Sequence, residues 1–164
     1  MVFRVASSIT GSGGALGNYG FFLSTQNQTN GGETTENLVS FNTQVGASGI
    51  TNSSGTITFT TAGVYQVILE LAWTSSTGAN PTITSWFQQN SANIANSSQD
   101  FQLLGGANTV QFGSCVFIIT AAINDTVKAY WSCSDTNVSL AYQGVQSNPD
   151  RPASPSAFLS IVQV

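Results

Sequence analysis

Few side chains of this 164-residue chain could perform acid–base or nucleophilic chemistry. The chain has seven aspartate and glutamate residues, two cysteines and no histidine, so the usual Ser-His-Asp and Cys-His arrangements are unavailable. Glu33 and Glu36 lie close in sequence, inside a polar loop. A carboxylate pair of the kind used by glycosidases could arise only across loops, for example from Glu70 and Asp100. We interpret the carboxylates as solvated surface charges and expect no catalytic residues and no enzymatic activity.

The sequence predicts neither a metal ion nor a cofactor. No calcium-loop pattern of the form D-x-[DN]-x-[DN]-G occurs. The segment GSGG at residues 11–14 lacks the lysine and the following helix of a phosphate-binding loop, so we interpret it as a turn.

The two cysteines leave two alternatives open. Cys115 and Cys133 lie nine residues on either side of Asn124. If the flanking strands formed one simple hairpin, the two side chains would face each other and could form a disulfide. In a jelly roll the same strands can belong to opposite sheets, and we therefore expect free, buried thiols.

Charged residues are scarce. Only 6% of the chain is charged, with three Lys and Arg residues against seven Asp and Glu, and the isoelectric point is near 4.1. Three scattered basic residues exclude a nucleic-acid footprint. No apolar run approaches the roughly 18 residues of a membrane span, and no basic-then-apolar leader opens the chain, so we expect no membrane partner.

The composition favours strands and turns. The chain holds 22 Ser, 19 Thr, 14 Asn and 16 Gly, while 41% of it is hydrophobic. Threonine, β-branched and aromatic residues suit strands, whereas Asn, Gly and Ser suit turns. Alternating apolar residues predict eight to ten short strands, at residues 2–8, 21–24, 38–43, 56–60, 63–73, 83–89, 111–120, 127–133 and 157–164. Residues 91–100 are either a polar loop or a weak edge strand around Ile94.

This pattern predicts an all-β, single-domain jelly-roll β-sandwich of two antiparallel sheets over residues 1–164. Residues 1–20 are expected to hold an N-terminal strand and a Gly-rich lead-in. Two strands have apolar residues on both faces. In residues 63–73, Ile68 and Ala72 lie opposite the face of Tyr65 to Trp73; in residues 111–120 both faces are apolar. A second apolar face needs a second cover, which is either a neighbouring subunit or long loops laid over the sheets.

Several local motifs, in the same order along the chain, resemble the trimeric jelly-roll superfamily of tumour necrosis factor and the complement 1q globular head. They are AGVYQV at residues 62–67, WFQQN at 86–90 and NDTV at 124–127. The last departs from the family pattern, since Asn124 replaces a glycine. FLSTQNQ at residues 22–28 and the PASPS turn at 152–156 before the final strand are similar to the viral and phage branch of that superfamily.

The resemblance implies a ten-strand sandwich that associates as a homotrimer. We expect the strand at residues 63–73 and the C-terminal strand to lie near the trimer axis. The interface residues expected from this placement are Tyr65, Val67, Leu69, Phe117, Phe158 and Ile161.

The first functional hypothesis is a non-enzymatic virion structural protein, that is, a homotrimeric capsid decoration or cement protein, or a minor capsid protein, on the particle surface. The alternative is a receptor-binding knob that recognises a host surface glycan or protein through the loops at residues 26–36, 74–81 and 135–150. An enzyme acting on surface polysaccharide is a third hypothesis. The expected loop contacts are Asn30, Glu33, Asn80 and Tyr142.

Overall fold

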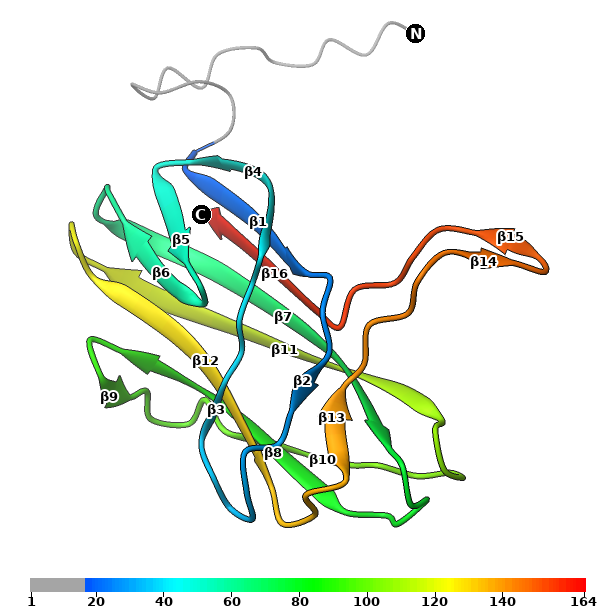
Figure 1. Cartoon of the computed structure of the whole chain (residues 1–164). Helices are drawn as coiled ribbons and strands as arrows, with labels where there is room; N and C mark the ends of the chain where they lie inside the picture. The colour runs from blue at the N-terminus through cyan, green and yellow to red at the C-terminus, as the bar shows by residue number, and fades with distance from the viewer. Residues whose placement is uncertain (1–16) are drawn as a thin grey trace, which may run out of the picture.

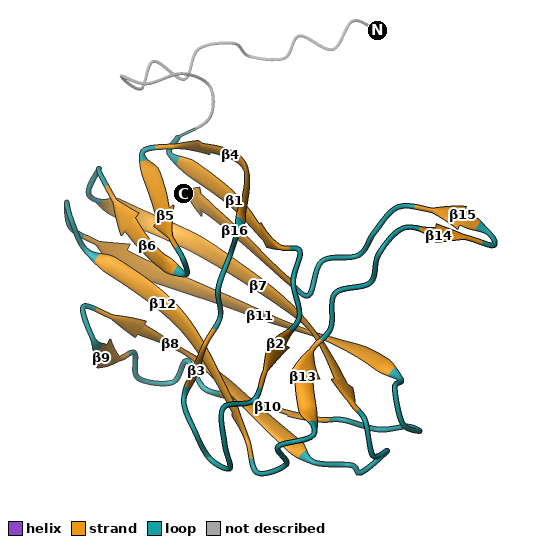
Figure 2. Ribbon diagram, in the orientation of Figure 1, coloured by secondary structure: helices purple, strands orange, loops and turns teal. Residues whose placement is uncertain are grey.

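A computed structural model describes residues 17–164, and these residues form strands and loops without a helix (Figure 2). Two antiparallel sheets of seven strands each face one another as a sandwich (Figure 1). The first sheet contains β1 (Tyr19–Ser24), β2 (Gln28–Thr29), β4 (Thr43–Ser48), β7 (Gly63–Ser75), β11 (Val110–Ala121), β13 (Val138–Leu140) and β16 (Ala157–Gln163). The second contains β3 (Asn37–Leu38), β5 (Ile50–Ser53), β6 (Thr56–Phe59), β8 (Thr82–Gln89), β9 (Ala92–Asn93), β10 (Gln99–Gln102) and β12 (Thr126–Cys133). The predicted all-β sandwich is thereby confirmed.

Strand β7 organises the first sheet. From Gly63 to Thr74 it pairs with β11 on one side, and its other side pairs first with β16 and then, from Trp73 to Ser75, with β13. Beyond β16 the sheet continues through β1 to β4. In the second sheet β12 is central, because it pairs with β8 on one edge and with β3 and β6 on the other.

The core lies between the sheets and follows the two-residue period of the strands. Every second residue of β7 from Tyr65 to Trp73 is at most 2% exposed. On the facing sheet, β12 contributes Val127, Ala129 and Trp131 to the same cluster. Each large apolar side chain buried in this way stabilises the fold by roughly 1.5–3 kcal/mol relative to an exposed one.

Several predicted strands differ in detail from those observed. Val39 and Phe41, from the strand predicted at residues 38–43, are buried, but they lie between β3 and β4 rather than inside one strand. The expected loop at residues 26–36 contains the short strand β2, and Tyr19 and Gly20 of the expected lead-in already belong to β1. The predicted strand at residues 2–8 lies outside the described residues.

A polar corner fixes the point where the chain crosses from β11 in one sheet to β12 in the other. One Asp125 carboxylate oxygen accepts hydrogen bonds from the backbone N–H of Ala122 and the side chain of Gln89, both at 2.8 Å. The other oxygen accepts one from Asn90 at 2.7 Å. These donors stabilise the ionised carboxylate, led by the Ala122 amide, and hold the pKa of Asp125 below its usual value.

Three loops lie side by side at one end of the sandwich (Figure 1). The loop between β2 and β3 meets the loop after β12, since the Thr34 N–H donates to the Cys133 carbonyl at 3.3 Å. The loop after β7 meets the same segment, since the Ser76 N–H donates to the Asn137 carbonyl at 3.2 Å. Residues widely separated in sequence are therefore presented together.

A separate hairpin projects from the sandwich (Figure 1). It consists of β14 (Gln146–Ser147) and β15 (Asp150–Arg151), and its root is closed by two backbone hydrogen bonds between Gln143 and Ser154, at 3.0 and 2.8 Å. We call residues 143–154 the hairpin arm. Val145 near its root is 72% exposed.

Candidate functional site: the outer face of the β7 sheet

The outward side chains of β1, β4, β7, β11 and β16 form one continuous surface, which we call the apolar face. Directly paired residues of an antiparallel sheet point to the same side, so the strand register gives the rows of this surface. Three rows, read from β11 through β7, β16 and β1 to β4, are Ser114–Glu70–Phe158–Leu23–Thr43, Val116–Ile68–Ser160–Phe21–Gly46 and Ile118–Gln66–Val162–Tyr19–Ser48.

Apolar side chains dominate this surface and remain accessible. On β11, Phe112 is 65% exposed and Val116 and Ile118 are each 52% exposed. Three aromatic rings lie next to each other across β1 and β16, with centroids 6.1 Å apart for Tyr19 and Phe21 and 6.3 Å apart for Phe21 and Phe158. Contiguous exposed apolar surface of this kind is typical of an interaction site rather than of a surface that faces water alone.

Glu70 is the one charged residue in the seven strands of this sheet. It is exposed and lies between Ser114 of β11 and Phe158 of β16 in its row. Neither neighbour can pair with its charge. A partner that covered the apolar face would therefore have to solvate this carboxylate or meet it with a hydrogen-bond donor.

Most of the residues expected at the trimer interface lie on the inner side of the sheet and not on its outer face. Tyr65, Val67, Leu69 and Ile161 are at most 1% exposed and fill the sandwich core, so their side chains do not reach the surface. The outward residues of the same strands are their sequence neighbours, because a shift of one residue exchanges the two faces. Phe158 is half-buried on the apolar face, whereas Phe117 packs against the core.

The expected loop-contact residues separate into two groups. Asn30 and Glu33 belong to the cluster of loops at one end, but the Asn30 side chain is partly buried and donates to the carbonyls of Cys133 and Asp135, at 2.9 and 3.1 Å. Asn80 is exposed on the loop after β7. Tyr142 lies elsewhere, at the root of the hairpin arm, where its N–H donates to Asn27 at 2.7 Å. Sequence spacing alone could not separate these positions.

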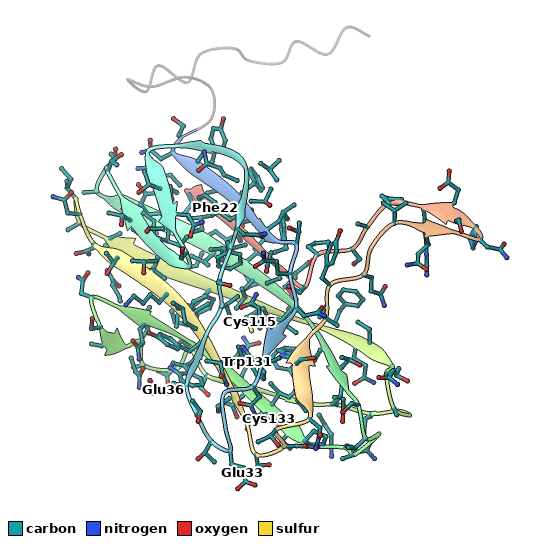
Figure 3. The ribbon with its side chains drawn as sticks, in the orientation of Figure 1. Phe22, Glu33, Glu36, Cys115, Trp131 and Cys133 are labelled. Atoms are coloured by element: carbon teal, nitrogen blue, oxygen red, sulfur yellow. The ribbon has the colours of Figure 1, made fainter. Side chains whose placement is uncertain are left out.

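The structure brings no two of the four carboxylates considered in the sequence together as a catalytic pair; these are Glu33, Glu36, Glu70 and Asp100. Glu70 points outward from the first sheet and Asp100 from the second, where it accepts a hydrogen bond from Thr84 at 2.7 Å. Glu33 and Glu36 are both exposed on the loop between β2 and β3 (Figure 3). Within residues 17–164 there is no cluster of three acidic, cysteine or histidine residues that could hold a metal.

Both cysteines lie between the sheets, on different strands of different sheets (Figure 3). They are free thiols. The Cys115 sulfur is 3.1 Å from the Ser85 hydroxyl, and burial raises the pKa of both thiols. A raised pKa disfavours the thiolate, so neither cysteine has the character of a nucleophile.

In the described part of the chain, no helix has the length and apolar character required to cross a membrane.

Comparison with known proteins supports the fold through structure rather than sequence. Neither the models of known protein families nor the curated protein sequences give a match. Crystal structures of murine APRIL are similar; the one at pH 8.5 has a TM-score of 0.58 at 9% identity, covering 90% of this chain and 98% of that one. The globular domain of zebrafish complement 1qA has a TM-score of 0.57 at 15% identity, covering 90% and 97%.

The sandwich is thus a jelly roll structurally like those of tumour-necrosis-factor-like proteins and complement 1q globular domains. This confirms the superfamily-level likeness inferred from the motifs as far as fold is concerned. The likeness to the viral and phage branch is untested by these comparisons and stays a hypothesis.

Proposed function

We propose that the protein is a homotrimer in which the apolar face of each subunit is covered by its neighbours. The single observation that carries this proposal is the exposed Phe112, Val116 and Ile118 of β11, which β7 alone separates from the half-buried aromatic rings of β1 and β16 on the same face. Domains of this fold usually form homotrimers, and a closed ring of identical subunits covers such a surface without leaving an open end.

The proposed role of the trimer is that of a non-enzymatic virion structural protein, a decoration, cement or minor capsid protein on the particle surface. The motifs at residues 22–28 and 152–156 support this role, as does the scarcity of charged residues. The hairpin arm is the element suited to contact a capsid protein, because it projects away from the sandwich (Figure 1).

The oligomeric state is tested by light scattering on a sizing column. We expect a mass of about three times 17.1 kDa, and we expect Val116→Asp to yield monomers because it places a charge in the covered surface next to Glu70. Ile123→Asp is the matched control. Ile123 is also an exposed aliphatic residue, at 60%, but it lies in the turn after β11, so its variant should stay trimeric. A monomeric native protein would contradict the proposal.

Attachment to the particle is tested with capsids that lack the protein. The native trimer should bind them, and a variant in which Gly-Gly replaces residues 145–152 should remain trimeric but bind less. Failure of the native trimer to bind would reject the capsid role while leaving the trimer standing.

The receptor-binding knob is kept as a second candidate because of one observation. The loop between β2 and β3 and the loop after β7 are each hydrogen-bonded to the segment at the end of β12, which would present the three together to a host surface glycan or protein. Only the start of the expected loop at residues 135–150 lies there, since the rest contains β13 and β14 and enters the hairpin arm. Binding of the trimer to host cells, weakened by changes at Glu33 and Asn80 and not by the loss of the hairpin arm, would favour this candidate over the capsid role.

A further inference from the structure

The outer face of the second sheet carries one aromatic pair. Trp86 of β8 and Tyr130 of β12 are directly opposite each other in the strand register, and both are half-buried. Their rings are nearly parallel, at 17°, with centroids 5.8 Å apart. This separation exceeds the roughly 3.5–4.0 Å of atoms in contact, so the rings are offset and share a common apolar surface.

The indole ring of Trp86 is held in place by a hydrogen bond. Its Nε1–H donates to the side-chain oxygen of Asn93 at 3.1 Å. Asn93 belongs to β9, which is itself paired with β8 through Gln88. The ring is therefore oriented before any ligand arrives, which lowers the entropy cost of binding.

A hollow of about 260 Å³ lies beside this ring, lined by Trp86, Asn93, Ile94, Asn96, Ser97 and Ser98. Hydrogen bonds hold the floor of this hollow in place. The Ser97 hydroxyl, in a residue only 2% exposed, donates to the Ile94 carbonyl at 2.8 Å and accepts from the Phe87 N–H at 3.1 Å. Asn96 and Ser98 are exposed at its rim.

We propose that this hollow, together with the Trp86–Tyr130 pair, binds one neutral pyranose residue of a glycan. A pyranose has an apolar face of C–H groups that suits an aromatic ring, and hydroxyls around its edge that both donate and accept. The lining supplies the matching groups, since amides and hydroxyls also do both. None of the six lining residues is charged, which favours a neutral sugar over an acidic one.

The site is separate from the apolar face. Trp86 and Tyr130 lie on the opposite sheet, so covering the apolar face does not by itself cover them. A second cavity, of about 270 Å³ between β10 and β11, includes Phe112 in its lining. Since Phe112 belongs to the apolar face, that cavity is the weaker candidate for an external ligand.

The chain provides its own reporter for binding. Of its three tryptophans, Trp73 and Trp131 are 2% and 0% exposed, so acrylamide quenches mainly Trp86 fluorescence. The probes are neutral oligosaccharides ending in glucose, galactose, mannose or an N-acetylhexosamine, with a sialylated oligosaccharide and a proline-rich peptide as comparators. We expect at least one neutral oligosaccharide to protect Trp86 from quenching in a saturable manner.

Variants assign the effect to the site. Tyr130→Ala and Asn96→Gly keep the reporter, and each should weaken protection about tenfold, the loss expected from one aromatic or one paired polar contact. Asn108→Gly is the matched control, because Asn108 is also exposed and has a similar positive φ, 64° against 62° at Asn96, but it lies in the loop before β11. Circular dichroism and solution mass check that each variant folds.

Three results would overturn the proposal. They are the absence of saturable protection by every neutral oligosaccharide, protection that Tyr130→Ala and Asn96→Gly leave unchanged, and protection by the peptide or the sialylated oligosaccharide alone. If Tyr130→Ala fails to fold, Tyr130→Phe together with Asn96→Gly gives the same decision, with the loss then expected from Asn96→Gly only.

Discussion

The two outer faces of the sandwich differ in what they offer to a partner. The apolar face carries branched and aromatic side chains and a single charge, at Glu70. The outward residues of the second sheet are mostly polar: Thr58, Thr82, Thr84, Gln88, Asp100, Gln102, Thr126, Lys128 and Ser132, with Trp86 and Tyr130 among them. A surface of the first kind is stable when a large partner covers it, whereas the second kind can face water and still hold a small ligand at its aromatic pair.

The two sheets differ in their outward residues but not in the character of their inward residues. Inward residues of both sheets are apolar because they build one shared core. The outward residues do not pack in that core, so their polarity reflects what each sheet contacts outside it. Substitutions on the two sides of β7 test which positions point inward and which point outward.

The largest effect is expected from the inward side of β7. Leu69 is fully buried, and Ile68, the residue before it in the strand, lies on the apolar face. Leu69→Ala should reduce the free energy of unfolding by about 2–5 kcal/mol, because it removes buried methyl groups and leaves a cavity. Urea unfolding measures this loss.

Ile68→Ala is the matched control for Leu69→Ala. With both variants placed in one monomeric background, Ile68→Ala should cost clearly less than Leu69→Ala, since Ile68 is only partly buried in the subunit. Equal losses at the two positions would mean that the faces of β7 are assigned incorrectly.

The next effect concerns the single charge of the apolar face. Glu70→Gln should strengthen subunit association by about tenfold, because the neutral amide costs less to remove from water than a carboxylate with Ser114 and Phe158 as row neighbours. Sedimentation at decreasing protein concentration gives the dissociation constant of the trimer.

Glu36→Gln is the control for the charge itself, because Glu36 is exposed on the loop between β2 and β3. It makes the same change in net charge and should leave the dissociation constant unaltered. Weaker association of Glu70→Gln would show that the carboxylate accepts a hydrogen bond from a neighbouring subunit instead.

The sequence predicts the strands of this protein better than it predicts their outward surfaces. The alternation from Tyr65 to Trp73 identifies both the strand and its inward side once those large residues are assigned to the core. In β11, by contrast, the face that includes Val116 and the face that includes Cys115 are both apolar. The two-residue period of the strand alone does not say which of these faces is buried. The structure settles it, with Cys115 buried and Val116 half exposed.

The candidate sites depend on register between distant segments, and this is why sequence reasoning missed part of them. Trp86 and Tyr130 are neighbours only because β8 and β12 pair with that register. Four of the six expected interface residues belong to the core, and the outward residues of the apolar face are their sequence neighbours on the same strands, β7 and β16. Assigning the large alternating residues to the core first would have left their sequence neighbours as the outward residues of the apolar face.

The smallest effect is expected at Asp125, where the chain passes from one sheet to the other. Its pKa is lowered in the folded state by the hydrogen bonds from Ala122, Asn90 and Gln89. A lowered pKa adds stability that is fully present above the usual value of 3.8 and is lost as the pH falls through the folded-state pKa. Asp125→Asn should therefore have a lower melting temperature than the native protein at pH 6, and the gap should narrow below pH 3.8. Asp150→Asn, in the exposed hairpin arm, is the control and should have the same melting temperature as the native protein at every pH. If the melting temperatures of Asp125→Asn and the native protein instead differed by the same amount at every pH, this corner would not contribute to the acid sensitivity of the fold.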